Sequence, residues 1–395
     1  MKIAIVGAGI GGLTAALCLA RDGHQVTLLE RKPEFVELGA GVQCGANAMR
    51  VLLSLGLGSA LDQYAVAPSE VVLRHGLSGE TLYSTALGAS YRARYGAPYY
   101  HLHRAHLQQV LVDAVQREPG VDIRMHTQVE GFKDTLTGVK IQAAELDLEV
   151  DCLIGADGIR SAVRRQLSPG VEPRNTGNVA WRGVIDVARL PADFMPHIAT
   201  NFVGPNRHMV VYYLAAGQLL NFVGVVENRP SSTLDWVSAA PWQMLKDDFS
   251  GWHPMVQTLI DAVDKDACYR WSLCDLPPMS SWTQGRVALL GDAVHATLPF
   301  MASGAALAIE DARVLQRALA AESNLQRALL VYQNSRRARA HQVQRNSARV
   351  GHLYHLSSAW LQKQAFHGLR LAGRRQERLL AEYDANHSSL ASALY

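Results

Sequence analysis

Hydrophobic residues near the N-terminus form two strand patterns with a helical pattern between them. Lys2–Val6 is a short β-branched run, which predicts a buried parallel strand. Apolar residues then recur at helical spacing from Leu13 to Ala20, and a second strand is expected over Gln25–Leu29. This order predicts a βαβ unit and therefore a parallel sheet.

Two later hydrophobic runs also predict buried strands, and each ends in a turn that contains Gly and Asp. Val150–Ile154 leads into Gly155-Ala156-Asp157-Gly158, and Gly285–Leu290 leads into Gly291-Asp292-Ala293. Ligands collect at the carboxyl ends of parallel strands, so both aspartates are well placed to bind one. Each aspartate could equally be only a helix cap.

Between residues 176 and 275 the pattern changes to alternating polar and apolar positions. Strands are expected over Val179–Val187, His208–Leu214 and Leu219–Val226. This segment predicts an antiparallel sheet laid over the first domain.

The turn after the first strand carries the first candidate chemistry. Gly7 allows a tight turn, Gly9 lets the backbone approach a pyrophosphate, and Gly12 lets the helix pack closely on the strand. Glu30 ends the second strand, where it can bind an adenosine ribose. Arg31 could suggest a ribose 2′-phosphate, but Glu30 would repel that group, so FAD and NAD remain the candidates. The chain has one such glycine motif, so NADH or NADPH should bind only transiently.

Composition narrows the function classes. The chain has 395 residues, of which 48% are hydrophobic and 18% charged, with a net charge of +3. This excludes a disordered chain and argues against nucleic-acid binding. The charge is uneven, because Val331 to Arg378 holds ten basic residues and one acidic residue. Solvated basic helices are the favoured interpretation of this region, and an anionic partner or membrane surface is the alternative.

Cysteine and histidine usage points to a cytoplasmic protein without a metal site. The five cysteines are an odd number without metal-ligand spacing, which is typical of reduced thiols. The apolar N-terminus mimics a signal peptide, but its glycines mark a turn, and no transmembrane segment is expected. His101, His103 and His106 lack acidic or cysteine partners nearby, so no metal is predicted. His295 is expected to be structural.

The glycine motif with Glu30-Arg31, the Asp157-Gly158 turn and the Gly291-Asp292-Ala293 turn together resemble three fingerprints of the single-component flavin-dependent aromatic hydroxylases. The resemblance extends to about residue 345. It implies an α/β fold, with a Rossmann-like FAD-binding domain built on a discontinuous parallel sheet, an antiparallel β-sheet substrate domain and C-terminal helices. The implied FAD-binding segments are 1–70, 95–175 and 275–330. Segments 71–94 and 176–274 form the substrate domain, and 331–395 the basic C-terminal helices.

The resemblance also assigns cofactor residues. A helix N-terminus near Gly304 and Ala305 would aim its positive dipole end at the flavin. The family usually has Gln or a similar residue where Ser303 stands. The implied FAD-binding set is Gly7, Gly9, Gly12, Glu30, Arg31, Gln43, Arg104, Val129, Asp157, Asp292, Gly304 and Ala305.

Candidate catalytic residues lie in the alternating region. His208 and Tyr212 are four residues apart, so on a strand they share one face. An ordinary histidine can accept a phenol proton near neutral pH, and tyrosine can donate a hydrogen bond. The alternative is that both residues are only structural.

This His-x-x-x-Tyr strand resembles that of hydroxylases acting on 6-hydroxynicotinate and 3-hydroxybenzoate. The first group carries His at the position of Phe300, and the second carries Gln at the position of Pro299. A more apolar pocket is therefore expected here, lined by Tyr213, Pro299 and Phe300.

The predicted function is an FAD monooxygenase that uses NADH or NADPH and O₂. Through a flavin C4a-hydroperoxide it would hydroxylate a small phenolic or hydroxylated heteroaromatic carboxylic acid, with or without decarboxylation, as a monomer or homodimer. The rival hypotheses are another FAD oxidoreductase, either a halogenase or an alkene reductase, and a non-catalytic flavoprotein interaction module. The halogenase motif Trp-x-Trp-x-Ile-Pro is missing from the sequence.

Overall fold

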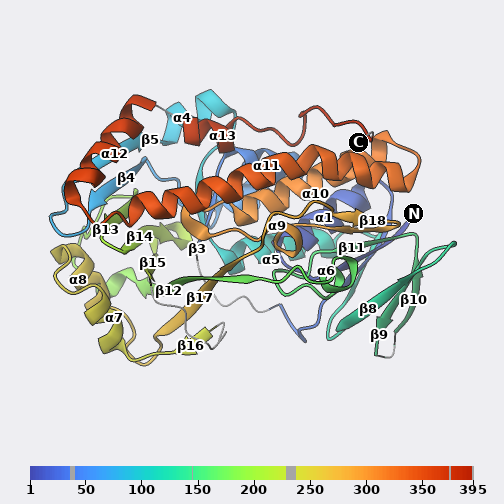
Figure 1. Cartoon of the computed structure of the whole chain (residues 1–395), viewed down its shortest axis with the longest axis horizontal. Helices are drawn as coiled ribbons and strands as arrows, with labels where there is room; N and C mark the ends of the chain where they lie inside the picture. The colour runs from blue at the N-terminus through green and yellow to red at the C-terminus, as the bar shows by residue number, and fades with distance from the viewer. Residues whose placement is uncertain (36–40, 145, 228–236, 373–374, 394–395) are drawn as a thin grey trace.

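The computed structural model describes residues 1–35, 41–144, 146–227, 237–372 and 375–393. Two large sheets lie side by side, and the long helix α11 (Leu325–Tyr354) runs along both of them (Figure 1). This arrangement lets one helix connect the two halves of the molecule.

The first sheet has six strands in the order β18-β19-β11-β1-β2-β7. All neighbours are parallel except β18 and β19. Ile3, Ile5 and Leu28 are fully buried, as expected for strands covered on both faces. The predicted Rossmann-like parallel sheet is confirmed. Its strands are β1 (Lys2–Val6), β2 (Gln25–Leu29), β7 (Val121–Arg124), β11 (Cys152–Gly155), β18 (Thr283–Gln284) and β19 (Val287–Leu289).

The second sheet has eight strands in the order β16-β17-β12-β15-β14-β13-β4-β5. It is antiparallel, as predicted, except that β13 pairs with β4 in parallel. The pair of β4 and β5 adds residues 70–86 to this sheet. Its strands are β4 (Glu70–His75), β5 (Thr81–Ala86), β12 (Arg174–Asp186), β13 (Ala199–Gly204), β14 (Arg207–Leu214), β15 (Leu219–Glu227), β16 (Val237–Ala239) and β17 (Tyr269–Asp275).

Two small antiparallel sheets complete the β structure. One pairs β3 (Gly41–Cys44) with β6 (Tyr100–His103), and the other contains β8 (Val129–Asp134), β9 (Val139–Ala143) and β10 (Leu146–Val150). Strand β3 lies against the eight-stranded sheet, since the Gly41 N–H donates to Asn221 Oδ1 on β15 at 2.9 Å.

Helices pack around both sheets. α1 (Ile10–Arg21) contacts α5 (Arg104–Gln116) and α10 (Gly304–Ala321). The remaining helices are α2 (Ala46–Ser54), α3 (Gly58–Asp62), α4 (Gly88–Tyr95), α6 (Ala162–Leu167), α7 (Trp242–Asp248), α8 (Pro254–Asp261), α9 (Asp292–His295), α12 (Ala359–Ala372) and α13 (Arg375–Ala381), with short 3₁₀ turns η1 (Val187–Arg189), η2 (Ala215–Gly217) and η3 (Pro299–Met301). No described helix is long and apolar enough to cross a membrane.

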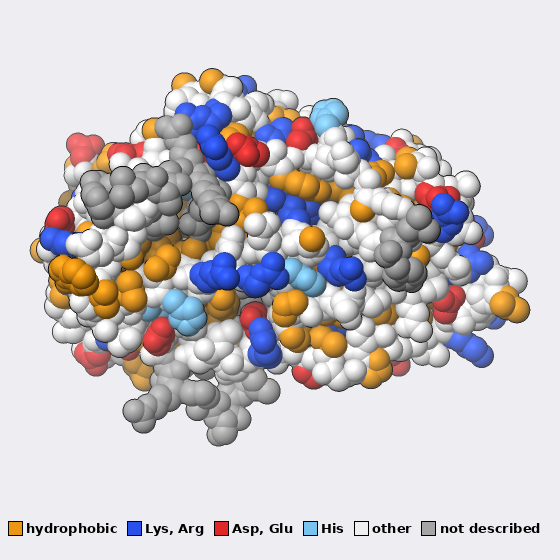
Figure 2. Space-filling model, turned by 45° about the horizontal axis from the view of Figure 1, so that its top comes forward, with side chains coloured by type: hydrophobic (Ala, Val, Ile, Leu, Met, Phe, Trp, Pro, Cys, Tyr) orange, Lys and Arg blue, Asp and Glu red, His pale blue; other side chains and the backbone are white. Residues whose placement is uncertain are grey.

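The basic C-terminal region is only partly solvated, which corrects one element of the sequence interpretation. Arg336 is fully buried and forms 2.7 Å ion pairs with Glu310 and Asp311 of α10. Arg339 also pairs with Glu310 at 2.7 Å. Arg345, farther along the same helix, is exposed. In Figure 2, Lys and Arg side chains form a row across the middle of the face that is shown. Part of the basic charge therefore anchors α11 to α10.

The two large sheets draw on different parts of the chain. Strands of the six-stranded sheet lie between residues 2 and 29, between 121 and 155, and between 283 and 289. The other sheet takes residues 70–86 and 174–275. The exact domain boundaries stay a prediction.

Candidate active site

The glycine turn between β1 and α1 shows why small residues are needed. Gly7 has φ +100°, and a Cβ there would lie 2.5 Å from the Ala156 carbonyl oxygen. A Cβ on Gly12 would lie 1.9 Å from the Gly7 carbonyl oxygen. A Cβ on Gly9, by contrast, meets nothing within 4 Å. Gly7 and Gly12 thus permit packing within the protein, whereas Gly9 faces open space.

The end of β2 holds an acidic group beside this turn. Glu30 Oε2 accepts a hydrogen bond from the Ala8 N–H at 2.8 Å, and its Oε1 accepts one from Lys32 N–H at 3.0 Å. Arg31 follows it and is exposed. Glu30 is therefore fixed next to the N-terminus of α1, where the first N–H groups have no side-chain cap.

Asp157 caps a helix, which was the alternative to ligand binding that the sequence left open for this residue. Its Oδ2 accepts from the N–H groups of Ala162 and Val163 in α6, at 2.7 and 3.3 Å. Its Oδ1 is buried and meets no hydrogen-bond partner within the described residues. Burial raises the pKa of this carboxyl group. Capping thus uses one oxygen and leaves the other for a ligand.

The turn after β19 meets the start of α10. Asp292 begins α9 and is exposed, and a Cβ on Gly304 would lie 3.8 Å from Asp292 Oδ1. Ser303 occupies the N-cap of α10, but its buried Oγ has no partner in the described part of the chain. The structure thus brings Asp292, Gly304 and Ala305 together at a helix N-terminus that lacks a side-chain cap.

These features fit FAD. The open space at Gly9, the unpartnered oxygens of Asp157 and Ser303, and the uncapped starts of α1 and α10 are suited to phosphate, ribityl and ring oxygens. Arg104 begins α5, and Val129 begins β8 with its side chain buried. Their contact with the cofactor stays a prediction, as does that of Arg31.

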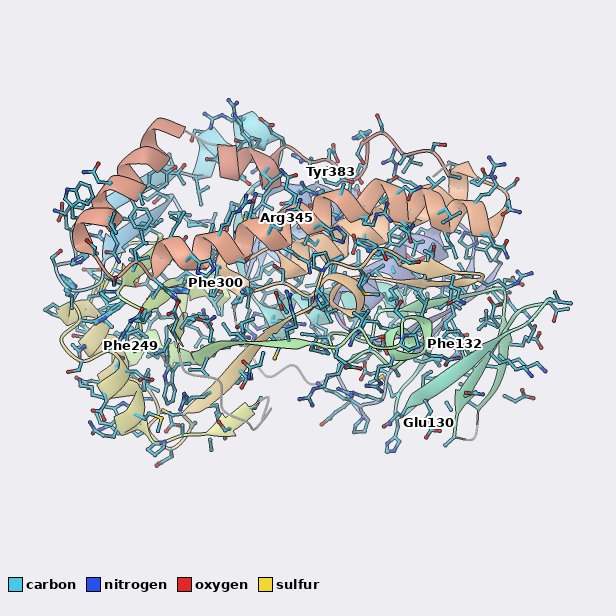
Figure 3. The ribbon with its side chains drawn as sticks, in the orientation of Figure 1. Glu130, Phe132, Phe249, Phe300, Arg345 and Tyr383 are labelled. Carbon is cyan, nitrogen blue, oxygen red and sulfur yellow. The ribbon has the colours of Figure 1, made fainter. Side chains whose placement is uncertain are left out.

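On the second sheet, His208 and Tyr212 lie on one face of β14 and are both buried. The His208 ring lies 5.2 Å from Phe300 and 5.3 Å from Tyr354, between centroids. Phe300 belongs to η3, beneath α11 (Figure 3). Its neighbour Pro299 is half-buried. The expected apolar side of the pocket is therefore formed by Phe300.

Gln43 links the tyrosines of this region. The Tyr99 hydroxyl donates to Gln43 Oε1 at 2.6 Å, and the Gln43 amide donates to the Tyr212 hydroxyl. The Tyr212 ring packs on His101 with centroids 4.4 Å apart. Burial raises the pKa of Tyr212 and lowers that of His101 to about 3. Tyr212 is therefore a protonated hydrogen-bond donor at neutral pH.

Tyr213 is not brought to this site. Side chains alternate along a strand, so Tyr213 lies on the opposite face of β14. Its hydroxyl donates to the Met195 carbonyl oxygen at 2.9 Å, and its ring packs on His197. The sequence analysis predicted Tyr213 as a pocket residue together with Tyr212, although two neighbouring residues on a strand point to opposite faces.

Burial also changes the expected chemistry of His208. Desolvation, with the nearby His355, lowers the pKa of His208 well below its ordinary value. His208 Nδ1 lies 2.7 Å from His355 Nε2, and His355 Nδ1 lies 2.8 Å from Glu227 Oε1. His208 is thus neutral at pH 7 and hydrogen-bonded.

Sequence reasoning missed Arg182, although its Val-Ala-Trp-Arg-Gly context is distinctive. The register of β12, β15 and β14 pairs Arg182 with Val223 and Val223 with Val210, which places Arg182 on the face of His208 and Tyr212. Burial and the charge of Arg104 lower the pKa of Arg182. Arg182 could have been found from the sequence, because a charged residue at an inward-facing position of a strand indicates a functional role.

Tyr354 and His355 were also missed, because Tyr354 ends the long helix α11 and His355 caps it, and no local motif marks either residue. The other histidines have structural contacts. His103 accepts from the Ala105 N–H at 3.3 Å, His106 packs on Tyr64, and His295 Nε2 lies 2.5 Å from Asp311. Among the described residues no group of three or more His, Cys, Asp or Glu is placed to hold a metal ion.

Comparison with known proteins agrees with this geometry. The FAD binding domain family matches residues 1–347. A 3-hydroxybenzoate 6-hydroxylase from Klebsiella oxytoca is 35% identical over 358 residues, covering 90% of this chain and 89% of the relative. A 6-hydroxynicotinate 3-monooxygenase from Pseudomonas fluorescens is 35% identical over 351 residues, covering 88% and 90%.

Solved structures show the same fold. Klebsiella pneumoniae HpxO, complexed with FAD and uric acid, superimposes with a TM-score of 0.83 at 28% identity, covering 96% of this chain and 97% of the other. A salicylate hydroxylase substrate complex gives a TM-score of 0.82 at 25% identity, covering 98% and 96%.

The fold and the glycine turn define a flavoprotein, and the chain belongs to the FAD binding domain family. Within it, the chain is an FAD-dependent aromatic hydroxylase that uses O₂ and a reduced nicotinamide co-substrate.

Proposed function

We propose that this hydroxylase adds one oxygen atom to the ring of a small phenolic or hydroxylated heteroaromatic carboxylic acid. The observation that carries the proposal is the pairing of His208 and Tyr212 on one buried face of β14, beside the apolar ring of Phe300. Relatives named for 3-hydroxybenzoate and 6-hydroxynicotinate support this substrate class.

FAD, reduced by NADH or NADPH, supplies the activated oxygen when it is bound. The protein's own residues bind and polarise the ring. His208 accepts the phenol proton, which makes the ring a stronger nucleophile. Tyr212, held protonated by burial, donates a hydrogen bond to the substrate.

Arg182 is suited to the substrate carboxylate. Its guanidinium lies on the face of the sheet that carries His208 and Tyr212, and its Nε is buried without a partner among the described residues. Burial and the charge of Arg104 both disfavour the charged form of Arg182, so a bound anion would stabilise the charged guanidinium. Ion pairing to a carboxylate is the ordinary use of such an arginine.

The test is a screen of hydroxybenzoates and hydroxynicotinates for stimulation of NADH and NADPH oxidation. A substrate should stimulate oxidation and yield a product that carries one oxygen atom from ¹⁸O₂. Product mass then separates hydroxylation from hydroxylation with decarboxylation, and peroxide release measures uncoupling. If no phenolic acid both stimulates oxidation and gains labelled oxygen, the proposal fails.

We also propose that the enzyme is cytoplasmic and acts as a monomer or homodimer that does not bind nucleic acid.

A further inference from the structure

Three ionisable side chains form a hydrogen-bonded row that begins at His208. His208 Nδ1 lies 2.7 Å from His355 Nε2, and His355 Nδ1 lies 2.8 Å from Glu227 Oε1. His208 is 2% exposed, whereas the Glu227 side chain is 42% exposed. The row therefore begins in the interior at β14, passes the end of α11 and reaches solvent at the end of β15.

The partners fix the proton on each ring. An ionised carboxylate only accepts hydrogen bonds, so His355 Nδ1 must carry the proton that points at Glu227. A neutral His355 then has its lone pair on Nε2, which accepts from His208 Nδ1–H. It follows that His208 Nε2 carries a lone pair and can accept a further proton.

We propose that His355 and Glu227 relay protons between His208 and solvent. The inference rests on the proposed function, because a phenolic substrate supplies the proton. The phenol O–H bond breaks as the proton binds His208 Nε2, and His208 Nδ1 passes its own proton to His355 Nε2. His355 Nδ1 passes its proton to Glu227, which releases it to water. The reverse transfer, when the hydroxylated ring regains its phenolic proton, restores all three groups.

Burial explains why a relay suits this site better than a single base. Desolvation lowers the pKa of His208 and of His355, so a stable imidazolium on either ring is disfavoured. The relay leaves both rings neutral before and after each transfer. The net result is a phenolate in the site and a proton delivered to water at Glu227, with no charge left on either imidazole ring.

Few other ionisable groups compete for these protons. Tyr354 packs on the His208 ring, and burial raises the pKa of its hydroxyl to about 12, so it stays protonated. His352, three residues earlier on α11, is exposed, and its charge lowers the pKa of His355. Among the described residues, Glu227 is the carboxylate in contact with His355.

The first experiment detects the predicted tautomers without any turnover. The holoenzyme, labelled with ¹⁵N-histidine, is studied by NMR of the imidazole nitrogens, with His208→Gln and His355→Gln variants to assign the signals. Both rings should be neutral and protonated at Nδ1. Protonation of His355 at Nε2 instead, with a bare nitrogen toward Glu227, would overturn the relay.

The second experiment measures proton release. A chromophoric nitrophenol carboxylic acid is bound to the holoenzyme, and ionisation of its phenol is followed after a pH jump. Glu227→Gln keeps the shape and a hydrogen-bond acceptor but cannot take a proton at pH 7. Ionisation and turnover should slow by about tenfold, less than the ~10²-fold or more expected for losing a general base, because water can partly replace Glu227. The KM for the aromatic acid should stay the same.

Two controls separate a relay from a structural role. Glu227→Asp should restore most of the rate, since it retains a carboxylate. Glu80→Gln removes a carboxylate of similar exposure that pairs with Lys363 at 2.9 Å, and should leave the rate unchanged. Wild-type rates in Glu227→Gln would refute the relay. A wild-type enzyme that hydroxylates no phenol would instead refute the proposed function, and the tautomers would still decide the relay.

Discussion

The cofactor side and the substrate side of the molecule are built in different ways. On the cofactor side, Gly7, Gly9 and Gly12 act through backbone geometry within one short turn, and Glu30 ends the next strand. On the substrate side, His208 comes from β14, Phe300 from η3 and His355 from the end of α11. The first group lies within one short stretch of the sequence, whereas His208, Phe300 and His355 meet only through tertiary packing.

We expect the largest loss of FAD binding and stability from a substitution in the glycine turn. Gly12 and Gly9 form a matched pair there, because only Gly12 is in close contact with the backbone. Gly12→Ala places a Cβ 1.9 Å from the Gly7 carbonyl oxygen, so α1 must move away from β1. We expect protein that purifies without FAD and melts at a lower temperature. Gly9→Ala meets no protein atom within 4 Å and should fold normally while binding FAD more weakly.

The flavin absorbance per chain and the thermal melt of each variant measure these outcomes. Stoichiometric FAD in Gly12→Ala would contradict the backbone argument. Stoichiometric, tightly held FAD in Gly9→Ala would show that the open space at Gly9 is not used by the cofactor.

His208→Gln should have the next largest effect. Losing a positioned acid–base group lowers turnover by roughly 10²- to 10⁴-fold. FAD content should stay at the wild-type level, because His208 belongs to the second sheet. Steady-state kinetics and flavin absorbance on the same preparation provide the measurement.

Tyr213→Phe is the matched control, since Tyr213 lies on the other face of β14 and donates to Met195. Its turnover should remain close to wild type. If His208→Gln lost FAD and turnover in equal proportion, His208 would be a structural residue.

This contrast explains what sequence reasoning could find. The βαβ unit and the turns at Asp157 and Asp292 were predictable, because a strand, a turn and a helix start are contiguous in the chain. That Tyr212 and His208 share one face of a strand was predictable from their four-residue spacing, and their catalytic roles stay a prediction. Tyr213 was misplaced by ignoring the same alternation.

His355 and Glu227 could not be predicted. They lie 128 residues apart, and no periodicity indicates that the end of α11 meets the end of β15. The burial of Arg336 was hidden for the same reason, since a run of arginines is ordinarily solvent-exposed. Its partners Glu310 and Asp311 are adjacent on another helix.

Arg336→Met tests how α11 is held in position to deliver His355. Removing one partner from a buried ion-pair cluster leaves Glu310 and Asp311 underpaired, which costs about 3–5 kcal/mol of unfolding free energy. Denaturant unfolding of the variant and wild type measures the loss. Arg345→Met, an exposed position on the same helix, should cost less than ~0.5 kcal/mol. Similar losses in both variants would argue against the anchoring role.

The smallest expected effect concerns acid stability at His101. Burial lowers the pKa of this histidine from 6.5 to about 3, and neither ring nitrogen has a partner in the described residues. The unfolded chain therefore binds a proton that the folded chain excludes, so stability is complete above pH 6.5 and falls as pH decreases toward 3. By pH 5 this histidine alone should cost about 2 kcal/mol.

His101→Phe removes the titrating group and keeps a ring against Tyr212. Its unfolding free energy should lose about 2 kcal/mol less than that of the wild type between pH 8 and pH 5. Parallel denaturant titrations at the two pH values measure the difference. An unchanged pH dependence would mean that His101 is protonated as easily in the folded chain as in the unfolded one. That result would place water or an anionic group beside the ring, which is fully buried and packed against Tyr99 and Tyr212.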